Sequence, residues 1–268
     1  MRRIFVLVSI LLAGCSVKLT ALRVTADLLD RGVTALYEET DVIYARESMT
    51  SHLKLMEALL KNDPFNKKIL LNLAQGFGGY AFLFLEDENP DRARYFYMKG
   101  RDFGRRLLAL GENNPPNASD APALFWTAYC WGGWASLSLD NPDAVADLPK
   151  VEAMVKKADE LHPGYFYGGT DLLLGAYYGS RPKMFGGDLE KSKNHFEKAI
   201  KITSVKFLMA QVLYAKYQAV AAQDQEKFRS LLETVISAPE GLLPEQGLSN
   251  QIAKEKAKNL LKKIDDLF

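Results

Sequence analysis

The sequence predicts an all-α fold, a right-handed α-solenoid of helix hairpins that ends in a C-terminal capping helix. Apolar residues recur at intervals of three and four along most of the chain, which is the period of a helix with one buried face. Prolines follow helical stretches, as in Asp63-Pro64 and His162-Pro163, where a proline would end one helix before the next begins. Stacked repeats of such a unit give a solenoid.

The clearest repeat unit runs from Asp171 to Ile202. Six of its residues match the spacing of a tetratricopeptide repeat, a helix hairpin of about 34 residues: Leu174, Gly175 and Tyr178 in the first half, and Ser192, Phe196 and Ala199 in the second. The loop at 181–188 is about five residues longer than the repeat consensus. We expect Asp188 to cap the second helix.

The amino terminus is typical of a targeting signal. Arg2 and Arg3 precede an apolar run at 4–12, which is far shorter than the ~20 residues that span a bilayer. Leu12-Ala13-Gly14-Cys15 resembles a bacterial lipobox. That resemblance implies a diacylglycerol thioether on Cys15, removal of residues 1–14 and acylation of the new amine, for example with palmitate. A plain secretory signal with an unmodified cysteine is the alternative.

These features divide the chain into a lipoprotein signal peptide at 1–14, a lipidated tether at 15–23 and a single tetratricopeptide-like helical domain at 24–268. Several acyl chains hold a protein on a membrane essentially permanently. We therefore expect a periplasmic protein that is lipid-anchored to a bacterial membrane, either the inner or the outer one.

Five helix pairs and a last helix are expected in the domain. The pairs are 24–46 with 48–62, 67–85 with 90–110, 121–139 with a helix that ends at 161, the two helices of 171–202, and 205–222 with 225–236. The last helix runs from a Ser249 cap to about 267. The stretch 121–139 has no charge and raises the question of a transmembrane helix. Its Gly132-Gly133 pair and hydroxyl residues favour a buried core helix instead.

Composition excludes several functions. Lys and Arg number 34 against 33 Asp and Glu, so no basic field would attract nucleic acid. The histidines at 52, 162 and 195 are far apart, and no metal-binding, nucleophile or phosphate-loop motif is present in the sequence. We expect no enzymatic activity, no cofactor and no metal.

Large aromatic rings are concentrated in 121–139 and in the repeat unit at 171–202. Core packing explains many of them, but so many rings on neighbouring helices would also line a cavity or groove. The candidate pore, ligand or partner surface comprises Trp126, Tyr129, Trp131, Trp134, Tyr177, Tyr178, Arg181, Lys183 and Phe185.

Three stretches together resemble the T component of tripartite ATP-independent periplasmic (TRAP) transporters. They are the lipobox, Pro122-x-Leu-Phe-Trp-x-x-Tyr-x-Trp-Gly-x-Trp, and 181–188 followed by 192–199. The resemblance implies a tetratricopeptide-like periplasmic lipoprotein that forms a homotrimer with a pore or groove. It also implies a complex with the substrate-binding protein of the transporter, a small organic or hydrophobic ligand, and no catalysis.

Two functions follow from these observations. The first is a membrane-anchored scaffold that binds the substrate-binding protein and passes ligand through an aromatic-lined pore. The alternative is a stand-alone lipoprotein that binds an apolar ligand or a cell-wall fragment without a protein partner.

Overall fold

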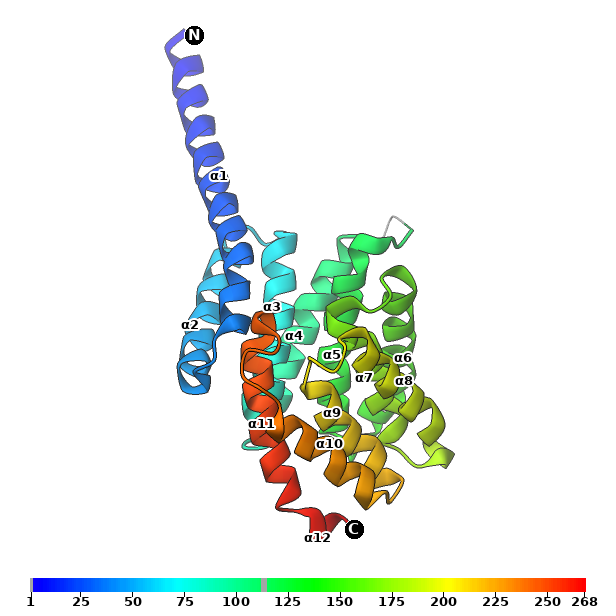
Figure 1. Ribbon diagram of the computed structural model, residues 1–268. Coiled ribbons are helices and arrows are strands. Elements are labelled where there is room, and N and C mark those ends of the chain that lie inside the picture. The colour runs from blue at the N-terminus through cyan, green and yellow to red at the C-terminus, as the bar shows by residue number, and fades with distance from the viewer. Residues whose placement is uncertain (1, 112–114) are drawn as a thin grey trace.

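In the computed structural model the backbone is described for residues 2–111 and 115–268, and side chains for residues 19–111 and 115–268. These residues form helices and no strand, which confirms the predicted all-α class (Figure 1). The α-helices are α1 (Arg2–Glu38), α2 (Val42–Leu60), α3 (Lys67–Tyr80), α4 (Pro90–Ala109), α5 (Ala121–Ser136), α6 (Pro142–Leu161), α7 (Tyr165–Gly179), α8 (Leu189–Ile202), α9 (Met209–Leu213), α10 (Gln225–Ser237), α11 (Gly247–Leu261) and α12 (Ile264–Leu267).

Five short helical segments join or extend these helices. Two are π-helical, η1 (Ala81–Leu85) after α3 and η4 (Tyr214–Ala219) after α9. The other three are single 3₁₀ turns, η2 (Ala118–Asp120), η3 (Lys183–Phe185) and η5 (Pro244–Gln246).

Side-chain caps start several of the α-helices. At each of five helix starts, one side-chain oxygen accepts a hydrogen bond from a backbone N–H of the first turn, which satisfies one of the free donors there. The five capping residues are Asn66, Asn89, Asn141, Asp188 and Asp224. The predicted cap at Asp188 is confirmed.

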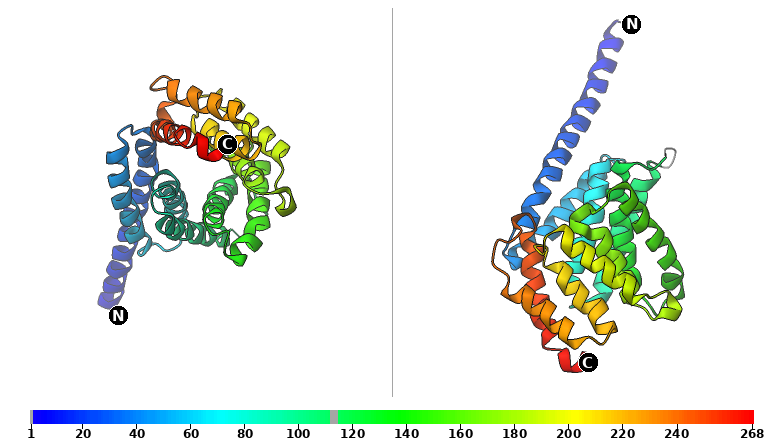
Figure 2. Two further views of the ribbon diagram at one scale, coloured as in Figure 1. Left: turned by 90° about the horizontal axis from the view of Figure 1, so that it is seen from below. Right: turned by 45° about the vertical axis from the view of Figure 1, so that its right-hand side comes forward.

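The helices follow one another around a closed path. Each of α3 to α8 packs mainly against its neighbours in the sequence, and α11 returns to contact α1 and α2 (Figure 2, left). Gly247 at the start of α11 lies so close to Glu38 at the end of α1 that an added Cβ would be 2.9 Å from the Glu38 carbonyl oxygen. Helices α1 and α11 therefore meet and close a ring. Helix α11 packs against α10 on one side and against α1 and α2 on the other.

The predicted hairpin at 171–202 forms from α7 and α8. The Phe196 ring is fully buried and occupies the space that a side chain at Gly175 would fill, 2.9 Å from an added Cβ. The Ser192 hydroxyl donates to the Gly175 carbonyl oxygen at 2.7 Å. Small residues thus let the two helices approach closely, as the repeat spacing requires.

Three predicted boundaries are wrong. The first pair breaks at residues 39–41 and not near residue 47, because the Asp41 carboxylate accepts from the backbone N–H groups of Ile43 and Tyr44 at 3.0 Å and starts α2 there. The helix expected from 205 begins at Met209. Ser249 is not a cap; it is buried inside α11, which starts at Gly247.

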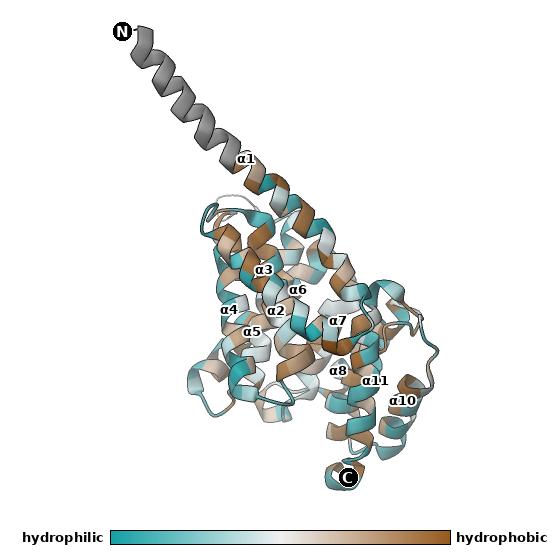
Figure 3. Ribbon diagram, turned by 90° about the vertical axis from the view of Figure 1, so that its left-hand side faces the viewer, coloured by the Kyte–Doolittle hydropathy of each residue, from teal (hydrophilic) through white to brown (hydrophobic). Residues whose placement is uncertain are grey.

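Helix α1 projects beyond the ring (Figures 1 and 3). It is anchored at its carboxyl end, where Asn72 donates to Asp30 at 3.1 Å and Gln75 to the Tyr37 hydroxyl at 2.6 Å. The backbone of the predicted tether at 15–23 is helical and belongs to α1. The Cys15 side chain lies outside the described side chains, so its lipidation stays a prediction.

Within the described part of the chain, one helical stretch is long and apolar enough to cross a membrane, Lys67–Leu85. Most of it is buried in the fold, as is common for a core helix. The uncharged segment at 121–139 forms α5, whose Phe125, Trp126 and Cys130 are buried.

Candidate functional site

The ring encloses a cavity of about 570 Å³. This volume lies within the range of small-molecule sites, roughly 300–1,000 Å³. Residues from α1, α3, η1, α4, α5, α6, α7, α9, η4 and α11 line it, so nearly every part of the ring contributes. Most of the wall is apolar and includes Phe82, Leu83, Val151, Val155, Leu172, Leu174 and Leu213.

Aromatic rings from the first turns of α5 and α7 line one end of the cavity. Phe125, Trp126 and Phe166 pack edge to face or tilted, with ring centroids 4.7 Å apart for Trp126 and Phe166 and 4.9 Å apart for Phe125 and Trp126. The Trp126 indole N–H donates to the Tyr165 hydroxyl at 3.2 Å. Phe166 and Tyr167 have left-handed backbones, with φ of 49° and 57°. Such conformations are strained for residues other than glycine and concentrate at functional sites.

The other end of the cavity opens to solvent. Five of its lining residues are exposed, and each ends or follows a helix: Asp87, Ser136, Leu139, Ser180 and Ala221. In Figure 1, α5 and α7 end on the side of the ring that faces away from the amino terminus of α1. The mouth of the cavity therefore lies at the end of the ring opposite to the projecting helix.

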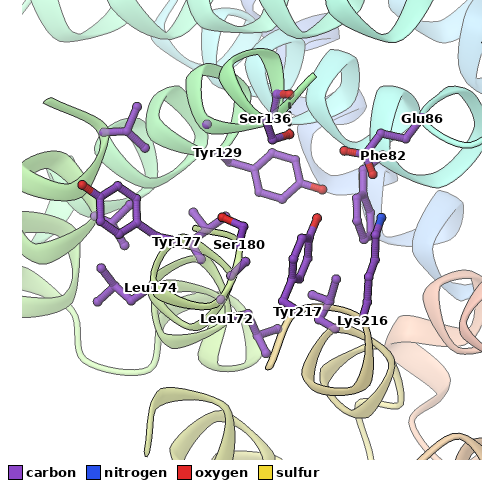
Figure 4. A pocket seen from close by; sticks show the side chains of 18 of the residues that line it. Phe82, Glu86, Tyr129, Ser136, Leu172, Leu174, Tyr177, Ser180, Lys216 and Tyr217 are labelled. Atoms are coloured by element: carbon purple, nitrogen blue, oxygen red, sulfur yellow. Dashed lines mark hydrogen bonds between the residues drawn. The ribbon is translucent and has the colours of Figure 1, made fainter. Parts of the chain in front are cut away.

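Polar side chains gather on one wall near this mouth. Glu86 follows η1, and Lys216 and Tyr217 belong to η4; Figure 4 shows Lys216 extending toward Phe82 and Glu86. The Tyr97 hydroxyl donates to Glu86 Oε1 at 3.1 Å. Burial raises the pKa of the Glu86 carboxyl above its ordinary value, against the opposing effect of Lys216.

Four of the nine candidate surface residues line the cavity. Trp126 and Tyr129 reach it from α5, and Tyr177 and Arg181 reach it from the end of α7. The Arg181 guanidinium also donates to the Tyr177 carbonyl oxygen at 2.7 and 3.0 Å and lies 3.4 Å from the Tyr177 ring centroid. Arg181 thus has a structural role at the end of α7 as well as a place at the mouth.

Three other candidates pack elsewhere. Trp131 and Trp134 lie against the guanidinium of Arg101 from α4, at 5.3 and 5.7 Å from their ring centroids. The Trp131 indole N–H donates to Asp147 at 3.1 Å. Tyr178 is buried against α6 and donates to Glu152 at 2.6 Å. These rings hold neighbouring helices together and do not line the cavity.

The remaining candidates lie in the long loop between α7 and α8. Phe185 is 61% exposed and Met184 is 83% exposed, and Lys183 is also exposed. The loop itself is tightly built, because the Asp188 N–H donates to the Tyr178 carbonyl oxygen at 3.0 Å. It follows Arg181 and so lies beside the mouth of the cavity.

Sequence reasoning missed the polar wall. Lys216 carries a signal that could have identified it, since it is the single charged residue between Lys206 and Asp224. A lone lysine in a buried apolar helix is costly unless it has a partner or a function. Glu86 carries no such signal, because it precedes Asp87 and Glu88 in what resembles a solvated acidic loop.

Among the described residues no group of three or more histidine, cysteine, aspartate or glutamate side chains is placed to hold a metal ion. The family model of the TRAP transporter T component matches residues 38–268. No curated protein matches the sequence.

Proposed function

The chain belongs to the family of TRAP transporter T components, and from this premise we propose that it binds the substrate-binding protein of a TRAP transporter and holds a small apolar ligand in its cavity. Membership places the chain among the components of a transporter and supports an association with its other parts. We propose in addition that this part is the substrate-binding protein and that the cavity holds the ligand.

The observation that carries the ligand role is the cavity itself. A folded chain gains stability by closing empty apolar space, because the atoms that line a void lose packing contacts. This ring instead keeps about 570 Å³ open among leucines, valines and aromatic rings. Mostly apolar walls with a few convergent polar groups are the usual features of a small-molecule site.

The position of the mouth supports exchange with a partner in the periplasm. We propose that Cys15 carries the lipid, so that α1 connects the membrane to the ring. The mouth then opens on the far side of the ring from the membrane, where a soluble binding protein could dock. Passage of ligand right through the ring would require Phe125, Trp126 and Phe166 to move apart.

Two further features belong to the proposal. The helix pairs are cryptic tetratricopeptide-like units of a solenoid that closes on itself, with the α7–α8 hairpin as the unit nearest to consensus. The anchored protein forms a homotrimer, as the family resemblance implies.

We place the docking surface for the substrate-binding protein on the loop at 182–187. Lys183 and Phe185 are exposed there and have no packing role, and the loop borders the mouth. Exposed aromatic side chains such as Phe185 are enriched in protein interfaces.

The test is binding between the full chain and the TRAP substrate-binding protein encoded by the same organism, measured by size-exclusion chromatography and by calorimetry. The proposal expects a complex, and expects the double variant Lys183→Ala, Phe185→Ala to weaken it by about tenfold or more, since anchor residues contribute at least ~2 kcal/mol each.

The matched control is Lys54→Ala, Leu55→Ala on α2, which also removes an exposed lysine and an exposed apolar side chain, far along the ring. Its complex should be unchanged. Equal weakening by both double variants would contradict the docking surface. No complex with the unmodified chain, together with binding of an apolar ligand, would favour the stand-alone lipoprotein.

A further inference from the structure

Two π-helical segments, η1 and η4, both contribute residues to the cavity wall. In η1 the Glu86 N–H donates to the carbonyl oxygen of Ala81, five residues back, at 2.9 Å. In η4 the same wide turn carries Lys216 and Tyr217. A π-helical turn inserts one residue into a helix, changes the direction of the side chains that follow, and occurs often at functional sites. Here both turns direct polar residues at one wall of an apolar cavity.

Glu86 is incompletely paired on that wall. Its Oε1 accepts the hydrogen bond from Tyr97, but its Oε2 is buried and has no hydrogen-bond partner among the described residues. Leaving a buried polar atom unpaired costs about 1–3 kcal/mol, so such atoms need an explanation. A polar group of a ligand in the cavity would supply the missing partner.

Lys216 also lacks a carboxylate in direct contact, although Glu86 and Asp87 lie near enough to act on it. Within the described residues it forms no ion pair, and its ammonium lies 5.3 Å from the Tyr217 ring centroid. The nearby Asp87 carboxylate is engaged in an ion pair with Lys256. Tyr217, Glu86 and Asp87 raise the pKa of Lys216 above its ordinary value, which favours its charged form, while burial raises the pKa of Glu86. The wall therefore presents an ammonium and a carboxyl group that form no direct ion pair with each other.

We propose that Lys216 and Glu86 form a head-group site that binds the carboxylate of an amphipathic ligand, a monocarboxylate with an apolar body. The Lys216 ammonium donates to the carboxylate, and Glu86 takes up a proton when the ligand binds and donates to it through Oε2. The apolar body extends along Leu172 and Leu174 toward the aromatic end of the cavity. This inference rests on the proposed ligand-binding function of the cavity and names the class of ligand.

The test compares three amphiphiles whose main chain has ten carbons and whose heads differ: decanoate, decanol and decyltrimethylammonium. Isothermal titration calorimetry is carried out on the full chain with Cys15→Ser, which blocks the expected lipidation. We expect decanoate to bind about tenfold or more tightly than decanol, the gain typical of a hydrogen-bonded charge. Lys216→Met should remove this preference.

Four control variants separate charge from structure. Lys216→Arg keeps the charge and should keep the preference. Lys191→Met removes a lysine on α8 that is outside the cavity and should also keep it. Glu86→Gln retains an N–H donor and should bind decanoate, whereas Glu86→Leu should bind it about tenfold more weakly.

Equal decanoate affinity in the unmodified chain and in Lys216→Met would overturn the inference, as would tightest binding of decyltrimethylammonium. If decanol still binds in either case, the apolar cavity remains a ligand site and only the head-group assignment fails. If none of the three probes binds, both the assignment and the ligand role of the cavity fail.

Discussion

Gly79, near the end of α3, offers a direct test of whether the ring is hollow. It lines the cavity, and no atom lies within 4 Å of the position that a Cβ would take. Its neighbour Gly78 points the other way, into the packed wall. A Cβ there would lie 2.6 Å from the Cys130 sulfur and 3.1 Å from the Tyr129 ring. The two substitutions Gly79→Ala and Gly78→Ala therefore share one helix and differ in the space available.

The magnitudes follow from this difference. Replacing glycine by alanine in a helix interior stabilises the folded state by about 0.8–1.0 kcal/mol, and both variants have this gain. An additional carbon in a well-packed core costs typically 1–3 kcal/mol, and this cost falls on Gly78→Ala alone. We expect Gly79→Ala to raise the free energy of unfolding by about 1 kcal/mol, and Gly78→Ala to be about 1–3 kcal/mol less stable than Gly79→Ala.

Urea unfolding followed by circular dichroism measures both free energies, and thermal melting gives a second reading. For a domain of this size, 1 kcal/mol corresponds to a change of about 2–4 °C in Tm. If Gly79→Ala is destabilised as much as Gly78→Ala, side chains fill the space beside Gly79 and the cavity is not present in solution.

Three further predictions concern single side chains. Burial raises the pKa of Glu86 in the folded state, so the cost of burying its charged form is absent below the ordinary carboxyl pKa of 4.5 and grows as the pH rises. Glu86→Gln should therefore increase the free energy of unfolding at neutral pH, on the order of 1 kcal/mol, with a matching rise in Tm. At about pH 4 the substitution should leave both unchanged. Arg181→Ala should lower the free energy of unfolding by about 1 kcal/mol, since it loses two hydrogen bonds to a helix end, whereas Lys183→Ala should change it by less than about 0.5 kcal/mol in the same urea assay. Phe196→Ala should cost about 3–5 kcal/mol, and a cost as small as that of the exposed Phe185→Ala would contradict the α7–α8 packing.

Much of the fold could be predicted from local sequence. Helix starts follow from Asn and Asp residues at turns, and the α7–α8 hairpin follows from the spacing of Gly175 and Phe196. These signals depend on neighbours a few residues apart. The closing contact between α1 and α11 joins segments more than two hundred residues apart, and nothing near Glu38 or Gly247 indicates it.

The site was predictable in its aromatic part and much less in its polar part. Trp126 and Tyr129 lie in a ring-rich helix, and the sequence shows that concentration directly. Which rings face the cavity could not be read, because Trp131 lies on another face of the same helix, against Arg101. The direction of Glu86 depends on the π-helical turn η1, for which the apolar sequence at 81–85 has no specific signal.

Binding of a neutral apolar fluorophore, N-phenyl-1-naphthylamine, by the full chain and by Gly79→Phe tests most directly the claim that the ring holds an apolar ligand. Gly79 lines the cavity and an added Cβ there would have open space around it, so we expect the phenyl ring to enter the cavity. We expect the unmodified chain to bind the fluorophore with a rise in emission, and Gly79→Phe to fold with the same circular dichroism spectrum and lose that binding. Equal binding by both proteins would contradict the account.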